Sequence, residues 1–310
     1  MIEKLYSKLK EHGFKGQVLS IQHLDDLRND IEKRHTQGDF DEEFYQEALS
    51  FFSFRPPSDF PNATFLIVVA IPRPQTKVNF TWNEKTLTLT LPPIYTNFRE
   101  IPRQVGKILT KVLAPEGYSV APARLPHKLL AVRSGLAKYG RNNISYIPGM
   151  GSFFQLATFY SDLPCQKDTW LEPCMLDRCQ NCKICLTKCP TGAITSEQFM
   201  IRAERCLTFH NERPSTYPFP SWVKQSDHNS LVGCMLCQQY CPENEKFLEC
   251  VESNIEFSHE ETSMFLKGSL YEQLPATTIK KIEKLGLVEY FETLSRNLAV
   301  FFDRKKINDQ

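Results

Sequence analysis

The chain has 310 residues, of which 41% are hydrophobic and 12% aromatic, so it can bury a sizeable core, and its length favours about two domains. Its 37 Lys and Arg residues nearly balance its 36 Asp and Glu residues, so the charge pattern does not favour long nucleic acid or an anionic membrane as a partner. No apolar run of about 18 residues is present and no signal-peptide core opens the chain, so we expect no membrane contact.

Helical and strand patterns alternate in the N-terminal part of the chain. Apolar residues at helical spacing predict a helix over residues 1–12, and a strand follows near residues 17–22. A second helical stretch covers residues 24–52 and is interrupted near Gly38. Residues 64–71 form a continuous apolar run rich in β-branched side chains, which predicts a central strand buried on both faces.

The next segments continue this alternation. Residues 78–82 and 86–91 alternate around a short polar turn, which predicts a hairpin whose threonines line a solvated or ligand-facing side. Apolar residues at helical spacing predict one helix over residues 99–113 and another over residues 129–136, which is weakened at Gly135 and ended by Gly140.

Residues 133–143 combine glycines with hydrogen-bonding side chains and have no core pattern. The glycines allow the backbone to approach a flat or bulky group, and the Arg-Asn-Asn run after Gly140 supplies donors. The segment matches neither a phosphate-binding loop nor a dinucleotide fingerprint. Two interpretations stay open: a ligand-facing loop, or a loop pinned by its own polar side chains. Apolar and aromatic stretches at 144–147 and 151–160 then predict strands of the sheet core.

Eight of the eleven cysteines follow a spacing that is typical of two iron-sulfur clusters. The first run, Cys-x2-Cys-x2-Cys-x3-Cys-Pro, extends from Cys179 to Pro190. An isolated Cys206 follows, and the second run, Cys-x2-Cys-x3-Cys-Pro, extends from Cys234 to Pro242. A 4Fe-4S cluster needs four thiolates, and in two-cluster ferredoxins the last cysteine of each run binds the other cluster.

This crossing assigns four ligands to each cluster. The ligands of cluster I are Cys179, Cys182, Cys185 and Cys241. The ligands of cluster II are Cys189, Cys206, Cys234 and Cys237. The isolated cysteine replaces the third member that the second run lacks. Each proline turns the chain away from its cluster, because its ring fixes φ and blocks a continuing helix.

Two other uses of cysteine fit the spacing less well. Zinc sites take four ligands from paired Cys-x2-Cys knuckles, whereas three cysteines here are evenly spaced and a proline follows the fourth. A disulfide framework is disfavoured because the cysteines are confined to the second half of the chain. Cys165, Cys174 and Cys250 are predicted to be ordinary buried or partly buried thiols. Oxygen-sensitive clusters and the absence of an export signal indicate the cytoplasm.

Short motifs occur in a specific order along nearly the whole chain. They are Arg133-Ser-Gly-Leu, Gly140-Arg-Asn, Gly151-Ser-Phe-Phe, Ser161-Asp-Leu, Cys189-Pro-Thr-Gly-Ala-Ile, Arg205-Cys206-Leu-Thr-Phe with Glu212, residues 260–265 and Ser295-Arg-Asn-Leu-Ala-Val300. This joint order resembles that of the epoxyqueuosine reductases, cobalamin-dependent iron-sulfur enzymes related to reductive dehalogenases.

The resemblance implies an α+β fold in three parts. Residues 1–172 would form a nitroreductase-like α/β domain that binds cobalamin, residues 173–250 a bacterial ferredoxin-like module with two 4Fe-4S clusters, and residues 251–310 a helical segment packed on the N-terminal domain. It implies a reductase in which electrons pass through the clusters to the corrinoid cobalt, which reduces the substrate. A low-potential donor such as ferredoxin or flavodoxin is the expected partner.

The resemblance also supplies candidate cofactor contacts. They are Arg133, Gly140, Arg141, Asn142, Gly151 and Ser152, in which Gly140-Arg141-Asn142 matches the Gly-Lys-Asn of the family. Arg141 keeps the positive charge of that lysine but changes its geometry.

One departure concerns the proton donor. The family has an aspartate shortly before an Ala-Pro pair, but Ala121 and Pro122 follow Tyr-Ser-Val, so no carboxylate occupies that place. Loss of such a donor commonly costs ~100- to 10,000-fold in rate. Tyr118, His127 and Tyr146 are the candidate substitutes, and each has a structural alternative as a packing tyrosine or a surface histidine.

The substrate stays open. Many epoxyqueuosine reductases continue into helical repeats that help hold transfer RNA, and this chain is expected to be a short form without them. A small molecule or a modified nucleoside is therefore favoured, with transfer RNA as an open alternative. The alternative function is a two-cluster electron-transfer or corrinoid-reducing partner protein without substrate chemistry of its own.

Overall fold

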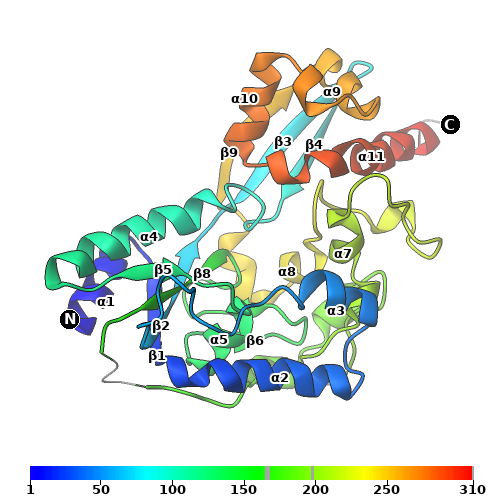
Figure 1. Cartoon of the computed structure of the whole chain (residues 1–310). Helices are drawn as coiled ribbons and strands as arrows, with labels where there is room; N and C mark the ends of the chain where they lie inside the picture. Colours follow the sequence, from blue (N-terminus) through cyan, green and yellow to red (C-terminus); the bar gives the residue numbers. More distant parts are fainter. Residues whose placement is uncertain (165–167, 197–198, 309–310) are drawn as a thin grey trace. The chain divides into compact units, whose positions relative to one another are not determined.

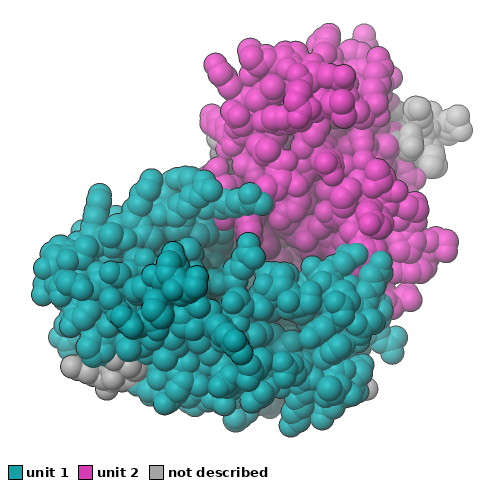
Figure 2. Space-filling view, in the orientation of Figure 1, with its two compact units in different colours: residues 1–72, 99–183, 195–204 teal, residues 73–98, 184–194, 205–310 magenta. Residues whose placement is uncertain are grey.

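The computed structural model describes residues 1–164, 168–196 and 199–308 and divides the chain into two compact units. Unit 1 contains residues 1–72, 99–183 and 195–204 (Figures 1 and 2). Unit 2 contains residues 73–98, 184–194 and 205–310. Both units are thus assembled from segments that are far apart in the sequence.

Unit 1 is built on a four-stranded antiparallel sheet with the order β1-β2-β8-β5. Its strands are β1 (Lys15–Ser20), β2 (Phe65–Pro72), β5 (Val120–Pro122) and β8 (Phe154–Ser161). Residues 65–70 of β2 are fully buried, because strands flank β2 on both sides and helices cover both faces of the sheet (Figure 1). The prediction of a central strand in this position is confirmed.

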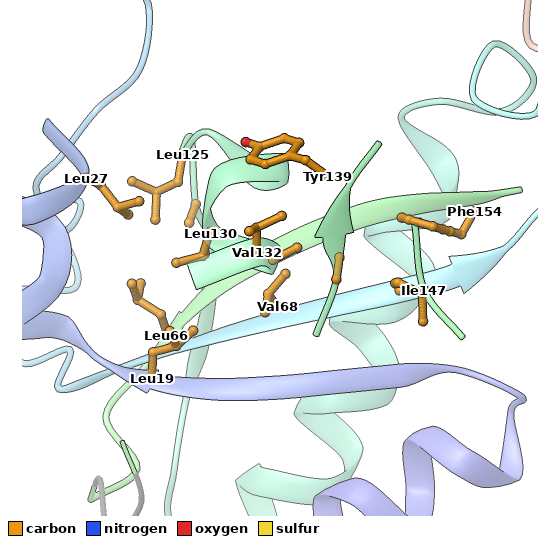
Figure 3. Close-up of a cluster of buried hydrophobic side chains, with 14 of the residues drawn as sticks. Leu19, Leu27, Leu66, Val68, Leu125, Leu130, Val132, Tyr139, Ile147 and Phe154 are labelled. Carbon is orange, nitrogen blue, oxygen red and sulfur yellow. The ribbon is translucent and has the colours of Figure 1, made fainter. Parts of the chain in front are cut away.

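Alternate residues of β2 enter two separate cores. Phe65, Ile67 and Val69 pack with α1 (Ile2–Glu11) and α4 (Glu100–Leu113), whose apolar residues recur at helical spacing. Both helices occupy the predicted positions. Figure 3 shows the opposite face, which packs against two further helices.

On that opposite face, Leu66 and Val68 meet Leu27 of α2 (Leu24–Thr36) and Leu130 of α5 (His127–Arg133). The segment after α2 contains Gly38 with a φ of 75°, and α3 (Glu42–Ala48) then begins after the cap residue Asp41. The predicted interruption of this helical stretch is therefore confirmed.

The loop that precedes the first cysteine run begins earlier than predicted. Helix α5 ends at Arg133, and Gly135 with a φ of 74° follows, so the chain turns there and not at Gly140. Residues after the turn form a short ribbon of β6 (Lys138–Tyr139) and β7 (Ser145–Tyr146). This ribbon fixes both ends of the intervening loop.

Unit 2 contains a three-stranded sheet with the order β4-β3-β9. β3 (Gln75–Trp82) and β4 (Lys85–Leu91) form the predicted hairpin, and the turn residues Asn83 and Glu84 have φ values of 47° and 63°. β9 (Val251–Phe257) runs parallel to β3. The expectation of a helical segment from residue 251 is therefore wrong at its start.

Helices complete unit 2. They are α6 (Ile184–Lys188), α7 (Leu207–Glu212), α8 (Leu236–Gln239), α9 (His259–Leu266), α10 (Ala276–Leu285) and α11 (Leu294–Asn308). Phe80 of the hairpin stacks on Phe257 at 5.1 Å between ring centroids, and Phe265 of α9 meets Phe257 edge-on. The hairpin thus shares a core with the C-terminal segment.

This shared core explains why the units differ from the predicted parts 1–172, 173–250 and 251–310. Residues 73–98 leave the N-terminal part because β3 pairs with β9. The C-terminal segment packs on this hairpin. In the part of the chain that the structure describes, no helix is both long and apolar enough to cross a membrane.

Candidate iron-sulfur site

The predicted cluster ligands are distributed between the two units. Unit 1 contains Cys179 and Cys182, which were assigned to cluster I. Unit 2 contains Cys185, Cys189, Cys206, Cys234, Cys237 and Cys241. All four predicted ligands of cluster II therefore lie in unit 2.

Short helices follow several cysteines of unit 2. Cys206 is the N-cap residue of α7, and backbone and side-chain hydrogen bonds from Thr208 reach its thiol. A backbone hydrogen bond from Leu236, the first residue of α8, reaches the thiol of Cys234. Helix N-termini favour thiolates because their N–H groups are not used within the helix.

The thiols of cluster II interact electrostatically. Burial raises the pKa of Cys206, and the charges of Cys189 and Glu212 raise it further. Burial also raises the pKa of Cys234 to about 11, and the charges of Cys206 and Cys189 add to this shift. Burial disfavours the charged form of the Cys206 and Cys234 thiols, and a bound metal cluster would offset this cost because metal coordination favours the thiolate.

Two polar side chains lie within hydrogen-bond distance of sulfur atoms in this group. Asn229 Nδ2 lies 3.2 Å from Cys234 Sγ, and Thr191 Oγ1 lies 3.6 Å from Cys189 Sγ. Among the described residues, no three His, Cys, Asp or Glu side chains converge as the ligands of one metal ion do. Cysteines that each bind a different iron atom of a 4Fe-4S cluster need no such convergence.

Asn211 connects the two segments that hold Cys206 and Cys234. It lies on α7, five residues after Cys206, and its Nδ2 donates to the carbonyl oxygens of Ser230 (3.3 Å) and Gly233 (2.9 Å). Gly233 directly precedes Cys234, and Asn211 is fully buried. This amide therefore holds α7, which begins directly after Cys206, against the loop that leads to Cys234.

Asn297 of α11 extends this connection. Its Nδ2 donates to the carbonyl oxygens of Asn211 (2.8 Å) and Leu231 (2.9 Å), and its side chain is fully buried. The neighbouring Arg296 donates to the carbonyl oxygen of His210 at 2.8 Å. Sequence analysis noted this segment only as part of a motif, because nothing in a helical pattern indicates that a polar residue is buried.

A buried acid lies at the end of α7. The hydroxyl of Tyr95 donates to Glu212 Oε1. Burial raises the pKa of Glu212 to about 7, although the hydrogen bond from Tyr95 lowers it. Burial also raises the pKa of Tyr95, and the charge of Glu212 adds to that effect. Glu212 is thus a group of unit 2 that can gain or lose a proton near neutral pH.

Arg141 of unit 1 contacts the first cysteine run. Its Nη2 donates to the carbonyl oxygens of Cys179 (2.5 Å) and Gln180 (3.4 Å), and its Nε donates to that of Cys182 (3.3 Å). Its Nη1 donates to the carbonyl oxygen of Ser196 at 2.8 Å. The guanidinium that the resemblance presented as a cofactor contact thus donates to the backbone of the cysteine run.

The residues beside Arg141 interact with one another. Asn142 Nδ2 donates to the hydroxyl of Tyr146 at 3.0 Å, and Asn142 Oδ1 accepts from the N–H of Ile144 at 3.3 Å. A Cβ atom on Gly140 would lie 2.5 Å from the ring of Tyr146. The structure therefore brings Gly140, Asn142 and the candidate proton donor Tyr146 together. This arrangement agrees with the interpretation of a loop pinned by its own side chains.

Arg133 lies at the end of α5 in a separate network. Its Nη2 pairs with Asp30 at 2.6 Å, its Nη1 pairs with Glu172 at 2.9 Å, and its guanidinium lies 5.2 Å from the ring centroid of Trp170. These contacts connect α2, α5 and the segment that leads to the cysteines. They account for the burial of Arg133 without a cofactor.

The remaining candidate contacts are Gly151, with a φ of 56°, and the buried Ser152. Among the described candidates, Arg133, Arg141 and Asn142 donate to protein groups. These contacts supply no independent support for a corrin site.

The three candidate proton donors lie in different environments. Tyr118 is partly buried in the core beside α1 and α4. His127 Nδ1 lies 2.8 Å from Thr158 Oγ1, and burial lowers the pKa of His127 to about 4. This imidazole is therefore neutral at pH 7. Tyr146 is buried and accepts the hydrogen bond from Asn142.

Asp162, which the sequence indicated only as part of the Ser161-Asp-Leu motif and not as a proton donor, lies near the Ala-Pro pair. Asp162 Oδ1 accepts from the N–H of Ser119 at 2.7 Å, because β5 and β8 pair with Val120 opposite Ser161. Residues 120–122 were not predicted to form a strand, so their pairing with residues 159–161 could not be inferred from the sequence. Of the three remaining cysteines, Cys165 lies outside the described residues. Cys174 and Cys250 are exposed, so the prediction of buried thiols is wrong for these two because both lie in surface segments.

Comparisons with known proteins support the iron-sulfur assignment. A family model described as a 4Fe-4S double cluster binding domain matches residues 178–244, which include all eight predicted ligands. The epoxyqueuosine reductase of Staphylococcus aureus is 31% identical over 120 residues, which are 39% of this chain and 30% of that protein. That of Leadbetterella byssophila is 29% identical over 147 residues, 47% of this chain and 44% of that protein. These matches span less than half of each relative.

Solved structures show the same fold. The epoxyqueuosine reductase from Streptococcus thermophilus matches with a TM-score of 0.67 at 18% identity, over 99% of this chain and 83% of that one. The enzyme from Bacillus subtilis matches with a TM-score of 0.67 at 19% identity, over 96% and 80% of the two chains. The predictions of an α+β fold and of a double-cluster segment are confirmed. The relatives are oxidoreductases, as expected.

Proposed function

We propose that this chain, which is related to the epoxyqueuosine reductases in sequence and fold, is an iron-sulfur oxidoreductase that delivers single electrons through two 4Fe-4S clusters to a bound corrinoid. The observation that supports the electron-transfer part is the double-cluster match over residues 178–244. The desolvated thiols of Cys206 and Cys234 agree with this part, because a cluster favours the thiolate form that burial disfavours.

The residues of unit 2 would hold and tune cluster II. Asn229 donates toward Cys234, and the hydroxyl of Thr191 would donate toward Cys189 once that thiol is a metal-bound thiolate without a proton. Hydrogen bonds to sulfur raise the potential of such clusters because they stabilise added negative charge. Glu212 and Tyr95 would hold a proton at a fixed place in the same unit. The expected electron donor is a low-potential protein such as ferredoxin or flavodoxin.

The corrinoid part of the proposal rests on the resemblance and on the relatives. When bound, cobalamin supplies a low-valent cobalt that reduces the substrate. The substrate class that we propose is a modified nucleoside or a small molecule with a similarly reducible group. Tyr146 is the proposed proton donor, because it lies in the loop with Gly140 and Asn142, whereas the neutral His127 offers no imidazolium at pH 7.

The decisive experiment counts iron and corrinoid in the same anaerobic sample. We expect about eight iron atoms per chain, because each of the two clusters contains four. Cys237→Ala should lower this number to about four, whereas Cys174→Ala, at an exposed cysteine outside the assigned ligands, should not change it. Full iron content in the Cys237 variant would contradict the ligand assignment.

A second candidate function is that of a two-cluster electron-transfer or corrinoid-reducing partner protein. The observation in its favour is that Arg133, Arg141 and Asn142 donate to protein groups. It predicts full iron content without stoichiometric binding of added cobalamin, or rapid cobalt reduction without turnover. Binding of one corrinoid per chain together with substrate turnover would exclude it.

A further inference from the structure

We propose that Arg141 is a positioning residue for the first cysteine run, which it holds through backbone carbonyls while placing a positive charge beside the cluster that these cysteines bind. This inference rests on the proposed function and deepens it. It assigns to Arg141 a role in cluster binding in place of the cofactor contact that its motif suggests.

The geometry is specific to a guanidinium. Cys179, Gln180 and Cys182 belong to one turn of chain, and their three carbonyl oxygens accept from Nη2 and Nε of Arg141. The carbonyl oxygen of Ser196 accepts from Nη1, which gives the guanidinium a fourth backbone acceptor. A planar guanidinium has five donors in a rigid fork, whereas a lysine ammonium has three donors at a single point. Arg141 therefore fixes the shape of the turn between two predicted ligands.

The chain before Arg141 holds the start of the same run. The N–H of Tyr139 donates to the carbonyl oxygen of Cys174 at 3.0 Å, and the N–H of Leu176 donates to that of Tyr139 at 2.8 Å. The ion pair of Lys138 with Asp177 at 3.2 Å is exposed on both sides and contributes little to this contact. Residues 139–141 thus lie alongside the cysteine segment 174–182. Tyr139 contacts the beginning of this segment and Arg141 contacts its end.

The charge of Arg141 points to an anionic neighbour. Its side chain is only 6% exposed, and within the described residues no carboxylate forms an ion pair with it. A buried cation without an anion is costly to keep. A cluster with four thiolate ligands has a net negative charge that grows by one on reduction, so Arg141 would stabilise the reduced state. The identity of the residue then affects the reduction potential as well as the fold.

The test uses the reconstituted full chain and three variants. Arg141→Gln removes both the positive charge and the planar set of donors. Arg141→Lys keeps the positive charge but removes the planar set of donors. Lys138→Gln is the matched control, because it removes a positive charge from the exposed ion pair beside the same run. Iron content and the midpoint potential of each cluster are measured by anaerobic titration with electron paramagnetic resonance.

We expect the Arg141→Gln variant either to lose one cluster or to keep it with a lower midpoint potential. In the second case the reduced-to-oxidised ratio of that cluster should fall about tenfold at a fixed potential, which corresponds to a midpoint shift of about 59 mV for one electron. The signal of the other cluster should be retained. Arg141→Lys should change the spectrum or iron occupancy of the same cluster with a smaller shift in potential. Lys138→Gln should match the wild-type protein.

Wild-type iron content, spectra and potentials in both Arg141 variants would overturn the inference. If Arg141→Gln does not fold, the lysine variant decides alone: an altered spectrum or occupancy of one cluster supports the positioning role, and wild-type behaviour refutes it. The wild-type titration separates this result from the larger proposal. A wild-type chain that binds no clusters contradicts the proposed function, whereas two normal clusters in every variant contradict only the role of Arg141.

Discussion

The cysteine segments of unit 1 and unit 2 are held by chemically different side chains. In unit 1 a single guanidinium, that of Arg141, donates to carbonyls of a turn whose residue Gln180 is exposed. In unit 2 the neutral amides of Asn211 and Asn297 donate to carbonyls of segments that are fully buried. In both units a side chain holds a cysteine segment through its backbone carbonyls, but water reaches the segment of unit 1 more easily than that of unit 2.

Access to water decides what each contact controls. A carbonyl in a partly exposed turn that loses its donor can accept from water more readily, so the free energy of unfolding should change less. A buried carbonyl that loses its donor stays unsatisfied, and each such group costs about 1–3 kcal/mol. We therefore expect Arg141 to act mainly on the cluster and Asn297 mainly on folding.

The largest expected effect is that of Asn297→Ala. The substitution leaves the buried carbonyl oxygens of Asn211 and Leu231 without this donor, so the free energy of unfolding should fall by about 3–5 kcal/mol. The measurement is urea denaturation of the variant and the wild-type protein at equal protein concentration.

Asn79→Ala is the control for this loss. Asn79 lies in the same unit and donates to Glu256 at 3.1 Å in an exposed contact, so its replacement should cost less than about 1 kcal/mol. Equal losses for the two asparagines would show that burial does not distinguish the amides of unit 2 from surface contacts.

The two units should respond to pH in opposite directions. In unit 1 burial lowers the pKa of His127 from 6.5 to about 4. The neutral imidazole therefore favours the folded state above pH 6.5, and this contribution is lost as the pH falls toward 4. One pKa unit equals about 1.4 kcal/mol, so the loss in unit 1 is on the order of 3 kcal/mol. His127→Gln should remove most of this dependence.

In unit 2 burial raises the pKa of Glu212 from 4.5 to about 7. The protonated carboxyl favours the folded state below pH 4.5, and this contribution is lost as the pH rises through 7, again on the order of 3 kcal/mol. Hydrogen exchange followed by mass spectrometry, which resolves residues of both units, should show unit 1 opening more at acid pH and unit 2 opening more above neutrality. Parallel changes in the two units would contradict the assignment.

How much of this structure could be predicted depends on whether the signal is local. The apolar run of β2 and the apolar spacing of α4 depend on neighbouring residues, and both elements were predicted. The cysteine spacing is also local, and it gave the double-cluster segment. By contrast, the parallel pairing of β3 with β9 brings together residues 75 and 251, which are far apart in the sequence. Because of this pairing the hairpin belongs to unit 2 and not to the predicted N-terminal domain.

The role of Arg141 could not be predicted for a different reason. Its partners are backbone carbonyls, which every residue has, so no pattern of side chains indicates them. Asn297 lies in a helix where a polar residue normally faces solvent, and only the fold shows that it is buried. The double-cluster segment was thus predictable from the sequence, whereas the residues that hold this segment were not, and the eight ligands stay a prediction.

The smallest expected effect concerns a close contact in unit 2. Gly233, directly before Cys234, has a φ of 71°, and a Cβ atom there would lie 2.5 Å from the ring of Tyr95. Gly268 has a φ of 69° and nothing within 4 Å of the same position. Gly233→Ala and Gly268→Ala therefore share the cost of a left-handed backbone, about 1 kcal/mol, and differ in the clash.

The clash should add about 1–3 kcal/mol, because the ring of Tyr95 is buried and cannot move without disturbing its hydrogen bond to Glu212. Urea denaturation of both variants measures the difference, and Gly233→Ala should also shift the spectrum of cluster II, since the next residue is a predicted ligand. Equal stability of the two alanine variants would mean that Tyr95 yields easily. In that case the packing around Cys234 would be as adaptable as the exposed turn that Arg141 holds in unit 1.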